Sequence, residues 1–262
     1  MKITTLIENT ACREGLVCEH GLSLYIETGS KRILFDAGQT GAFGDNAEKL
    51  GIDLSRVDLA VLSHGHYDHG GGLKRFLELN AAAPVYINQS AFSQCYNGPE
   101  KYIGLDPSLR ESDRLVFVED QMELGEGLTL LSCNDRPKVV PVNPFGLNIR
   151  ENGVTWPDDF RHEQYLLIRE NGKTVCISGC SHKGILNIVD WLRPDVLVGG
   201  FHFMKLDPAV DGDALRAAAG RLLSYPTRYY TGHCTGEAQF AYLKERMGDR
   251  LQSISTGSVI EL

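Results

Sequence analysis

Six consecutive residues carry four side chains that can bind a metal, in the run His64-Gly65-His66-Tyr67-Asp68-His69. Three imidazoles and one carboxylate supply the nitrogen and oxygen donors that zinc, iron or manganese accept. Alternate residues of an extended backbone point the same way, so His64 and His66 can hold one metal while Asp68 and His69 turn toward a second. The alternative is a solvated polar loop after a strand, but four donors at this spacing favour a site for two metals.

Two adjacent metals can hold one hydroxide between them, lower its pKa toward neutrality and polarise a carbonyl or phosphoryl oxygen. Hydrolysis is the reaction that such a site favours. Asp68 could orient the hydroxide or take its proton as a general base, which makes it the candidate catalytic residue. Phosphoester, thioester and lactone hydrolysis all need the same polarised oxygen, so the motif by itself does not rank these substrates.

The H-x-H-x-D-H pattern of these residues resembles that of the metallo-β-lactamase superfamily, residue by residue. The segment 33–38 (Ile-Leu-Phe-Asp-Ala-Gly) is similar to the early strand and turn of that family, and Thr231-Gly232-His233 to its last histidine motif. The resemblance implies a four-layer αββα sandwich with the metals at one edge of the sheets, and it implies that His233 is a ligand of the second metal. It also implies two divalent metal ions, with zinc favoured and iron or manganese as alternatives.

Four further segments resemble one branch of this superfamily, the branch named for a dihydropterin ribofuranosyl-aminobenzene-phosphate synthase. They are residues 19–23 (Glu-His-Gly-Leu-Ser), 178–184 (Ser-Gly-Cys-Ser-His-Lys-Gly), 199–202 (Gly-Gly-Phe-His) and 231–236 (Thr-Gly-His-Cys-Thr-Gly). The implied substrate is a small anionic molecule, either a phosphoester or a pterin-phosphate-like compound.

The sequence departs from the family pattern at two ligand positions. Cys180 stands where the family has a bridging Asp, and His182 follows two residues later. Either side chain could ligate: a Cys180 thiolate would favour zinc, while His182 is preferred because Gly179 and the start of a helix leave it free to approach. The alternative is a small buried thiol beside a capping histidine. The family pattern assigns the third histidine ligand of the first metal to His162, with Glu163 as a rival, although the local sequence lacks the Gly-His-Thr pattern of the family.

Three more residues are candidates for contact with substrate. His202 ends an expected strand beside two glycines, where a substrate could lie against the backbone. His20 precedes a strand near the N-terminus and could face the site, although a lone histidine is more often structural. Lys183, like Arg161 and Lys205, lies next to candidate site residues and could neutralise a phosphate or carboxylate, although each alone is more often a solvated charge.

Short β segments and helices must position these residues. Apolar and alternating runs predict strands near 3–7, 22–28, 32–35, 57–62, 85–87, 115–118, 128–131, 165–168, 175–177, 195–198, 228–231 and 259, and helices near 47–51, 73–79, 184–193, 213–224 and 236–246. Gly29-Ser30 is a hairpin signal. The pattern suggests two packed sheets with helices outside. The polar stretch 97–113 is interpreted as a long loop or lid, and 134–160 as irregular.

Composition limits the class of protein. The chain of 262 residues is expected to form one domain over 1–262, with 42% hydrophobic and 23% charged residues. A net charge of −8 makes nucleic acid a poor partner, and no apolar run is long enough for a membrane span. Seven cysteines without a C-x-x-C pair are expected to be reduced. We therefore expect a cytoplasmic protein with a small-molecule partner, and leave its oligomeric state open, with a homo-oligomer as one option.

Two other functions compete with hydrolysis. Iron on the same ligands could serve redox chemistry, which colour and an iron-dependent absorption band would reveal. A non-catalytic, metal-dependent binding module would instead retain a ligand without turnover. The intact Asp68 argues against the module, because a sensor does not need a side chain placed to handle a hydroxide proton.

Overall fold

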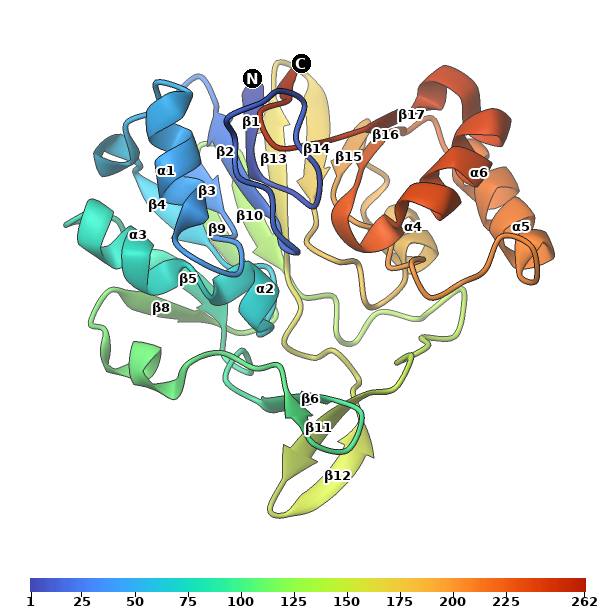
Figure 1. Cartoon of the computed structure of the whole chain (residues 1–262), viewed down its shortest axis with the longest axis horizontal. Helices are drawn as coiled ribbons and strands as arrows, with labels where there is room; N and C mark the ends of the chain where they lie inside the picture. Colours follow the sequence, from blue (N-terminus) through green and yellow to red (C-terminus); the bar gives the residue numbers. More distant parts are fainter.

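The computed structural model describes residues 1–262, and its centre is a pair of mixed seven-stranded sheets (Figure 1). The first sheet has the order β18 (Val259–Glu261), β1 (Lys2–Ile7), β2 (Ser23–Glu27), β3 (Arg32–Phe35), β4 (Leu59–Val61), β5 (Val85–Asn88) and β8 (Leu115–Val118). The second has the order β17 (Leu251–Ser253), β16 (Arg228–Thr231), β15 (Val196–Val198), β14 (Lys173–Ile177), β13 (Tyr165–Glu170), β10 (Leu128–Leu131) and β9 (Gln121–Gly125).

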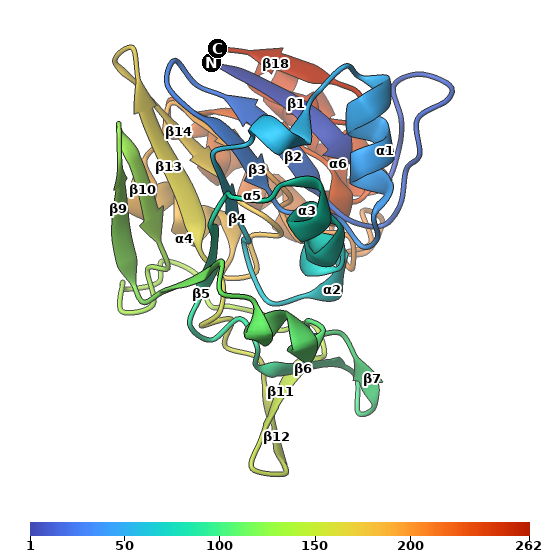
Figure 2. The same ribbon diagram turned by 90° about the vertical axis from the view of Figure 1, so that its left-hand side faces the viewer.

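Helices cover the outer face of each sheet, so the expected four-layer αββα sandwich is confirmed (Figures 1 and 2). The helices α1 (Ala42–Lys49), α2 (Tyr67–Gly70) and α3 (Leu73–Leu79) belong to the first half, and α4 (Ile185–Leu192), α5 (Gly212–Leu223) and α6 (Glu237–Met247) to the second. Four short 3-10 helices complete the set: η1 (Leu54–Arg56), η2 (Pro107–Glu111), η3 (His233–Thr235) and η4 (Gly248–Arg250). None of the helices combines the length and the apolar character that crossing a membrane requires.

The core lies in three layers because most strands are buried on both faces. In β2, Leu24 and Ile26 pack between the two sheets, whereas Tyr25 points the other way into the layer under the helices. The strand predicted over 22–28 pairs with β3 through the Gly29-Ser30 turn, with Leu24 opposite Phe35 and Ile26 opposite Ile33. This buried pairing fixes the first sheet around the strand that leads to the histidine motif.

The structure corrects the interpretation of 134–160 as irregular and of 97–113 as a plain loop. These segments contain β11 (Leu147–Glu151), β12 (Val154–Pro157) and β7 (Lys101–Tyr102), which join β6 (Gln94–Asn97) in a four-stranded sheet. The sheet projects from one end of the sandwich (Figure 2). Asn152 and Gly153 have φ angles of 51° and 78°, the geometry of a type I′ hairpin turn. That Asn-Gly pair is a sequence signal for the hairpin, but the four exposed residues of β12 carry no alternation that would mark a strand.

Candidate metal centre

The metal-binding candidates come from loops that follow neighbouring strands. The His64–His69 run follows β4 in the first sheet, and Cys180, His202 and His233 follow β14, β15 and β16 in the second. Strands β14, β15 and β16 are parallel, so their carboxyl ends lie at one edge of the sheet. Gly179 lets the two halves meet there, because a Cβ at that position would overlap Ser63.

A first group of donors consists of His64, His66 and His182. One ligand atom from each lies within 4.8 Å of the other two, and all three residues are buried. The Nε2 atoms of His64 and His182 are 3.3 Å apart. Phe160 stacks on the His182 ring at 4.5 Å between centroids, which holds the plane of that imidazole. The structure therefore puts His182, which the sequence favoured as the bridging ligand, beside the first two histidines of the motif, where His162 was expected.

A second group of donors lies beside the first. The Nε2 atom of His69 is 3.1 Å from the Cys180 Sγ and 3.1 Å from the His233 Nε2. Asp68 Oδ2 is 3.5 Å from the same His233 nitrogen. Cys180 also lies within 4.8 Å of the ligand atoms of His64 and His69, so its sulfur stands between the two groups.

The outward nitrogens of three imidazoles are bonded inside the protein. His69 Nδ1 lies 2.6 Å from Asp36 Oδ2, and His233 Nδ1 lies 3.0 Å from Asn9 Oδ1. The Ser63 hydroxyl donates to Asp36, which leaves its oxygen to accept from His64 Nδ1 at 2.8 Å. These bonds place the proton on Nδ1 and leave the Nε2 lone pair facing the site, the arrangement that orients histidine ligands in metal proteins.

The spacing of these donors fits a bound metal. Ligand nitrogens at about 2.0–2.1 Å from a tetrahedral zinc are about 3.3 Å apart. The observed separations between Nε2 atoms are 3.1 Å for His69 and His233 and 3.3 Å for His64 and His182. His69 and His233 both present lone pairs there, and such pairs repel unless a cation lies between them. The buried His, Cys and Asp clusters are thus consistent with metal binding.

Electrostatics keep two imidazoles of the first group neutral. Burial lowers the pKa of His64 and of His182, so both imidazoles are neutral at pH 7. Burial would raise the pKa of Asp68, but the neighbouring His69 and His233 side chains outweigh it and hold that pKa well below its usual range. Burial raises the pKa of the Cys180 thiol. Neutral imidazoles and an ionised carboxylate are the forms that bind metals.

His162 and Glu163, the alternatives that the sequence offered for the first metal, are members of neither group. His162 packs against His66 on the side of Cys95 and Asp158, not beside His182. The Glu163 carboxylate accepts the backbone N–H groups of His182 and Lys183 at 2.7 and 3.0 Å, so it shapes their loop.

The structure does not bring Lys183 to the site as expected for a substrate contact. Its side chain is buried, and its ammonium donates to the backbone carbonyls of Ser132 and Glu163 at 2.7 and 2.9 Å. The expectation failed because a lysine next to a ligand in sequence can point to the opposite side of the loop.

The donors line one pocket together with residues from several loops. His20 Nε2 is 3.4 Å from Asp68 Oδ2, and the His202 ring lies 4.2 Å from the His182 ring with both of its nitrogens unbonded. The remaining lining residues include Tyr67, Asn97, Lys101, Ile103, Leu147 and Lys205. Asn97, Lys101 and Leu147 were not foreseen, because they reach the pocket from β6, β7 and β11 of the small sheet.

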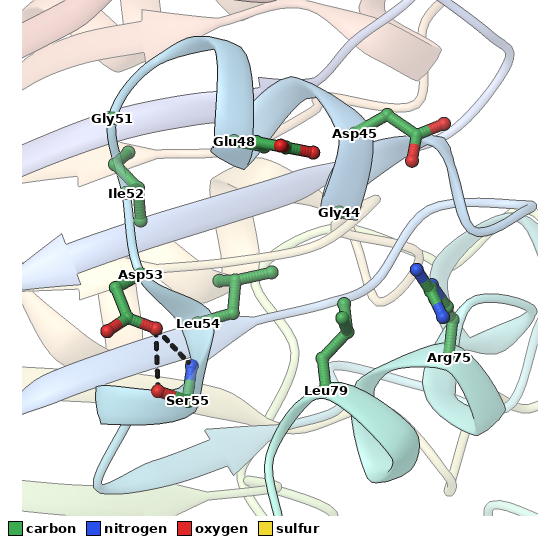
Figure 3. Close-up of a pocket in the computed structure, with 10 residues that line it drawn as sticks. All are labelled: Gly44, Asp45, Glu48, Gly51, Ile52, Asp53, Leu54, Ser55, Arg75 and Leu79. Atoms are coloured by element: carbon green, nitrogen blue, oxygen red, sulfur yellow. Dashed lines mark hydrogen bonds between the residues drawn. The ribbon is translucent and has the colours of Figure 1, made fainter.

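A separate cavity lies between α1, η1 and α3 and contains no histidine (Figure 3). One of its three acidic residues, Asp53, caps η1 by accepting hydrogen bonds from the backbone N–H and the hydroxyl of Ser55. These carboxylate bonds serve the local turn. The pocket with the histidines is the candidate functional site.

Comparisons with known proteins agree with this geometry. The family profile described as "Metallo-beta-lactamase superfamily" matches residues 16–154. An uncharacterized protein of Methanocaldococcus jannaschii is 30% identical, with 89% of this chain and 90% of that protein covered. A second protein of that organism, a 7,8-dihydropterin-6-methyl-4-(beta-D-ribofuranosyl)-aminobenzene-5'-phosphate synthase, is 29% identical over 100% of this chain and 96% of its own length. A crystal structure described as a metal-dependent hydrolase of the beta-lactamase superfamily is 30% identical, with a TM-score of 0.84 over 100% of this chain and 99% of the other.

Proposed function

Because this chain belongs to the metallo-beta-lactamase superfamily, we propose that it is a dinuclear metal-dependent hydrolase acting on a small anionic substrate. A phosphoester or a pterin-phosphate-like compound is the substrate class we favour, and zinc is the metal. The observation that carries the proposal is the approach of His69 Nε2 to both Cys180 Sγ and His233 Nε2 at 3.1 Å, beside the group formed by His64, His66 and His182.

The proposal assigns a role to each donor. His64, His66 and His182 would hold the first metal, Asp68, His69 and His233 the second, and Cys180 would lie between them. Divalent cations held there would supply Lewis acidity, lowering the pKa of water and polarising a phosphoryl or carbonyl oxygen. Asp68 would also orient the attacking water. Its Oδ2 lies 3.4 Å from His20 Nε2, so His20 faces the same carboxylate.

The lining of the pocket supports an anionic substrate. Lys101 and Lys205 bring positive charge to it, and His20 and His202 bring imidazole nitrogens. Cations at a pocket wall attract a phosphate or a carboxylate. The full-length relative named a pterin-phosphate synthase makes pterin phosphates the first specific compounds to test.

The test combines metal content with turnover. We expect about two zinc or manganese atoms at the proposed dinuclear centre of the protein purified without added metal, and hydrolysis of a chromogenic phosphodiester. His64→Ala and Asp68→Ala should each abolish turnover, whereas Asp213→Ala, at a highly exposed carboxylate, should keep it. Unchanged turnover in the first two variants would contradict the proposal. Two irons per chain in place of zinc or manganese would move the assignment to redox chemistry.

A further inference from the structure

An apolar cavity of about 210 Å³ adjoins the metal pocket and shares His182 and His202 with it as lining residues. Its other walls are the loop before β11, the start of α4, the loop after β15 and one side of α5. Nine of its fifteen lining residues are hydrophobic, and none is an acidic residue, a lysine or an arginine. The metal pocket, in contrast, is lined by Asp68, Lys101, Lys205 and five histidines. The two adjoining spaces therefore differ in the kind of chemical group that they can hold.

We propose that the apolar cavity binds a hydrocarbon ring of the substrate, while the phosphate or carboxylate of the same molecule binds in the metal pocket. The inference rests on the proposed function and narrows its substrate to an anion that carries such a ring. A mostly apolar space with a few polar groups is typical of small-molecule sites. Because an apolar cavity of about 150 Å³ can hold benzene, the size of this one suits a single ring.

The polar groups of the apolar cavity are few. Besides the two histidines, Asn143 and Ser181 have the only polar side chains among its lining residues. A pterin ring carries several nitrogen and oxygen atoms, and a site that leaves such atoms unpaired binds the molecule less well. The cavity therefore fits a phosphoester with a hydrocarbon ring better than a pterin.

His202 stands where the two spaces meet. Its ring centroid lies 4.2 Å from that of His182 and 5.6 Å from that of Phe145. Both of its ring nitrogens are buried and unpaired within the protein, which is unfavourable. The φ angle of His202 is 55°, a conformation that persists in a residue other than glycine only where the surrounding structure imposes it. A substrate that spans both spaces would offer these nitrogens a polar atom between its ring and its anionic group.

Lys205 connects the metal pocket to the wall of the apolar cavity. It is a lining residue of the metal pocket, and its ammonium donates to the Phe145 carbonyl at 2.5 Å. Phe145 in turn lines the apolar cavity beside His202. One lysine thereby brings positive charge to the side of the anion and holds the aromatic wall on the side of the ring.

The affinities of two phosphonates for the metal-loaded, full-length protein test the proposal. Methylphosphonate carries the anion alone, whereas benzylphosphonate carries the same anion with one ring. We expect benzylphosphonate to bind about 10- to 100-fold more tightly in isothermal titration calorimetry, which is the gain that burial of an aromatic ring gives. Equal affinities would overturn the proposal.

A matched pair of substitutions on α5 locates the bound ring. Ala214 is exposed and lines the apolar cavity, so Ala214→Phe should fill the cavity and remove the preference for benzylphosphonate without changing the affinity for methylphosphonate. Ala217 is exposed on the same helix but is not a lining residue, so Ala217→Phe should keep the preference. A preference that survives in Ala214→Phe would overturn the assignment of the ring to this cavity.

A neutral ligand separates this proposal from the proposed function. Hydrolysis of the chromogenic phosphodiester without a preference for benzylphosphonate would keep the hydrolase and overturn the ring site. Benzyl alcohol that binds the wild type but not Ala214→Phe in ligand-observed NMR, with neither phosphonate bound and no turnover, would support the ring site and contradict the anionic substrate of the proposed function. If none of the three ligands binds, the ring site is overturned, while the metal content still tests the dinuclear centre.

Discussion

Single side chains around the site act mainly by fixing the direction of a neighbouring imidazole. Asp36 is the strongest case, since its carboxylate is 2.6 Å from His69 Nδ1 and also accepts from the backbone and hydroxyl of Ser63. Asp36 is not itself a candidate ligand. Its carboxylate fixes the His69 ring and keeps the proton of that ring on Nδ1. Its contribution should therefore be visible in metal affinity.

We predict that Asp36→Asn lowers metal affinity about 10- to 100-fold, because the amide keeps the shape of the side chain but loses the charge that orients His69. Competition with a chromophoric chelator measures this affinity. Asp53→Asn is the matched control: Asp53 caps η1 in the separate cavity, so its replacement should leave metal affinity at the wild-type value. Equal affinities for the two variants would contradict the orienting role of Asp36.

At the scale of elements, the loop between β14 and α4 is held by buried charges. Glu163 accepts two of its backbone N–H groups, and the Lys183 ammonium is anchored to two carbonyls. Burial lowers the pKa of Lys183 to about 8, against 10.5 for the unfolded chain. Between these two pH values the folded protein has released a proton that the unfolded chain still holds, so this group makes stability rise with pH across the window.

We predict that the free energy of unfolding of the wild type gains about 3 kcal/mol relative to Lys183→Met between pH 8 and pH 10.5, because 2.5 pKa units correspond to that amount. Urea unfolding at several pH values measures both proteins, and the difference between them isolates this lysine. Lys173→Met, on an exposed strand position, should run parallel to the wild type. A wild-type minus Lys183→Met difference that stays flat with pH would rule out the buried, titrating ammonium.

At the scale of the whole molecule, the proposed metal centre joins the two halves of the sandwich. The loop after β4 of the first sheet carries His64, His66 and His69. Loops after strands of the second sheet carry Cys180, His182 and His233. A metal bound between them would bind the folded chain far better than the unfolded chain, in which these residues are dispersed. Ligand binding of this kind stabilises the folded state by mass action.

We predict that a chelator lowers the unfolding midpoint and that zinc restores it, with a gain of about 2.7 kcal/mol when free metal is 100 times its dissociation constant. Urea unfolding with and without zinc measures the gain. His64→Ala should lose most of the response, and Asp213→Ala should keep all of it. A wild-type midpoint that does not respond to chelator or zinc would contradict a metal held between the sheets.

The sequence was most informative about features formed by residues that lie close together in the chain. The H-x-H-x-D-H run, the strands with apolar periodicity and the hairpin at Gly29-Ser30 could be predicted, since each depends on residues close together in the chain. The αββα architecture followed from the family resemblance. The β11–β12 hairpin was missed because the four residues of β12 are all exposed and show no alternation, although Asn152-Gly153 carried a turn signal.

Only the tertiary structure decided which distant residues meet. All eight histidines of the chain lie in or beside the two donor groups, yet spacing alone could not sort His182 from His162 or place Lys183 away from the pocket. Asp36 and Asn9 gained their roles only when separate loops came together. The physical reason is that side-chain donors act over about 3 Å, while the segments that carry them are brought within that distance only by the packing of the two sheets.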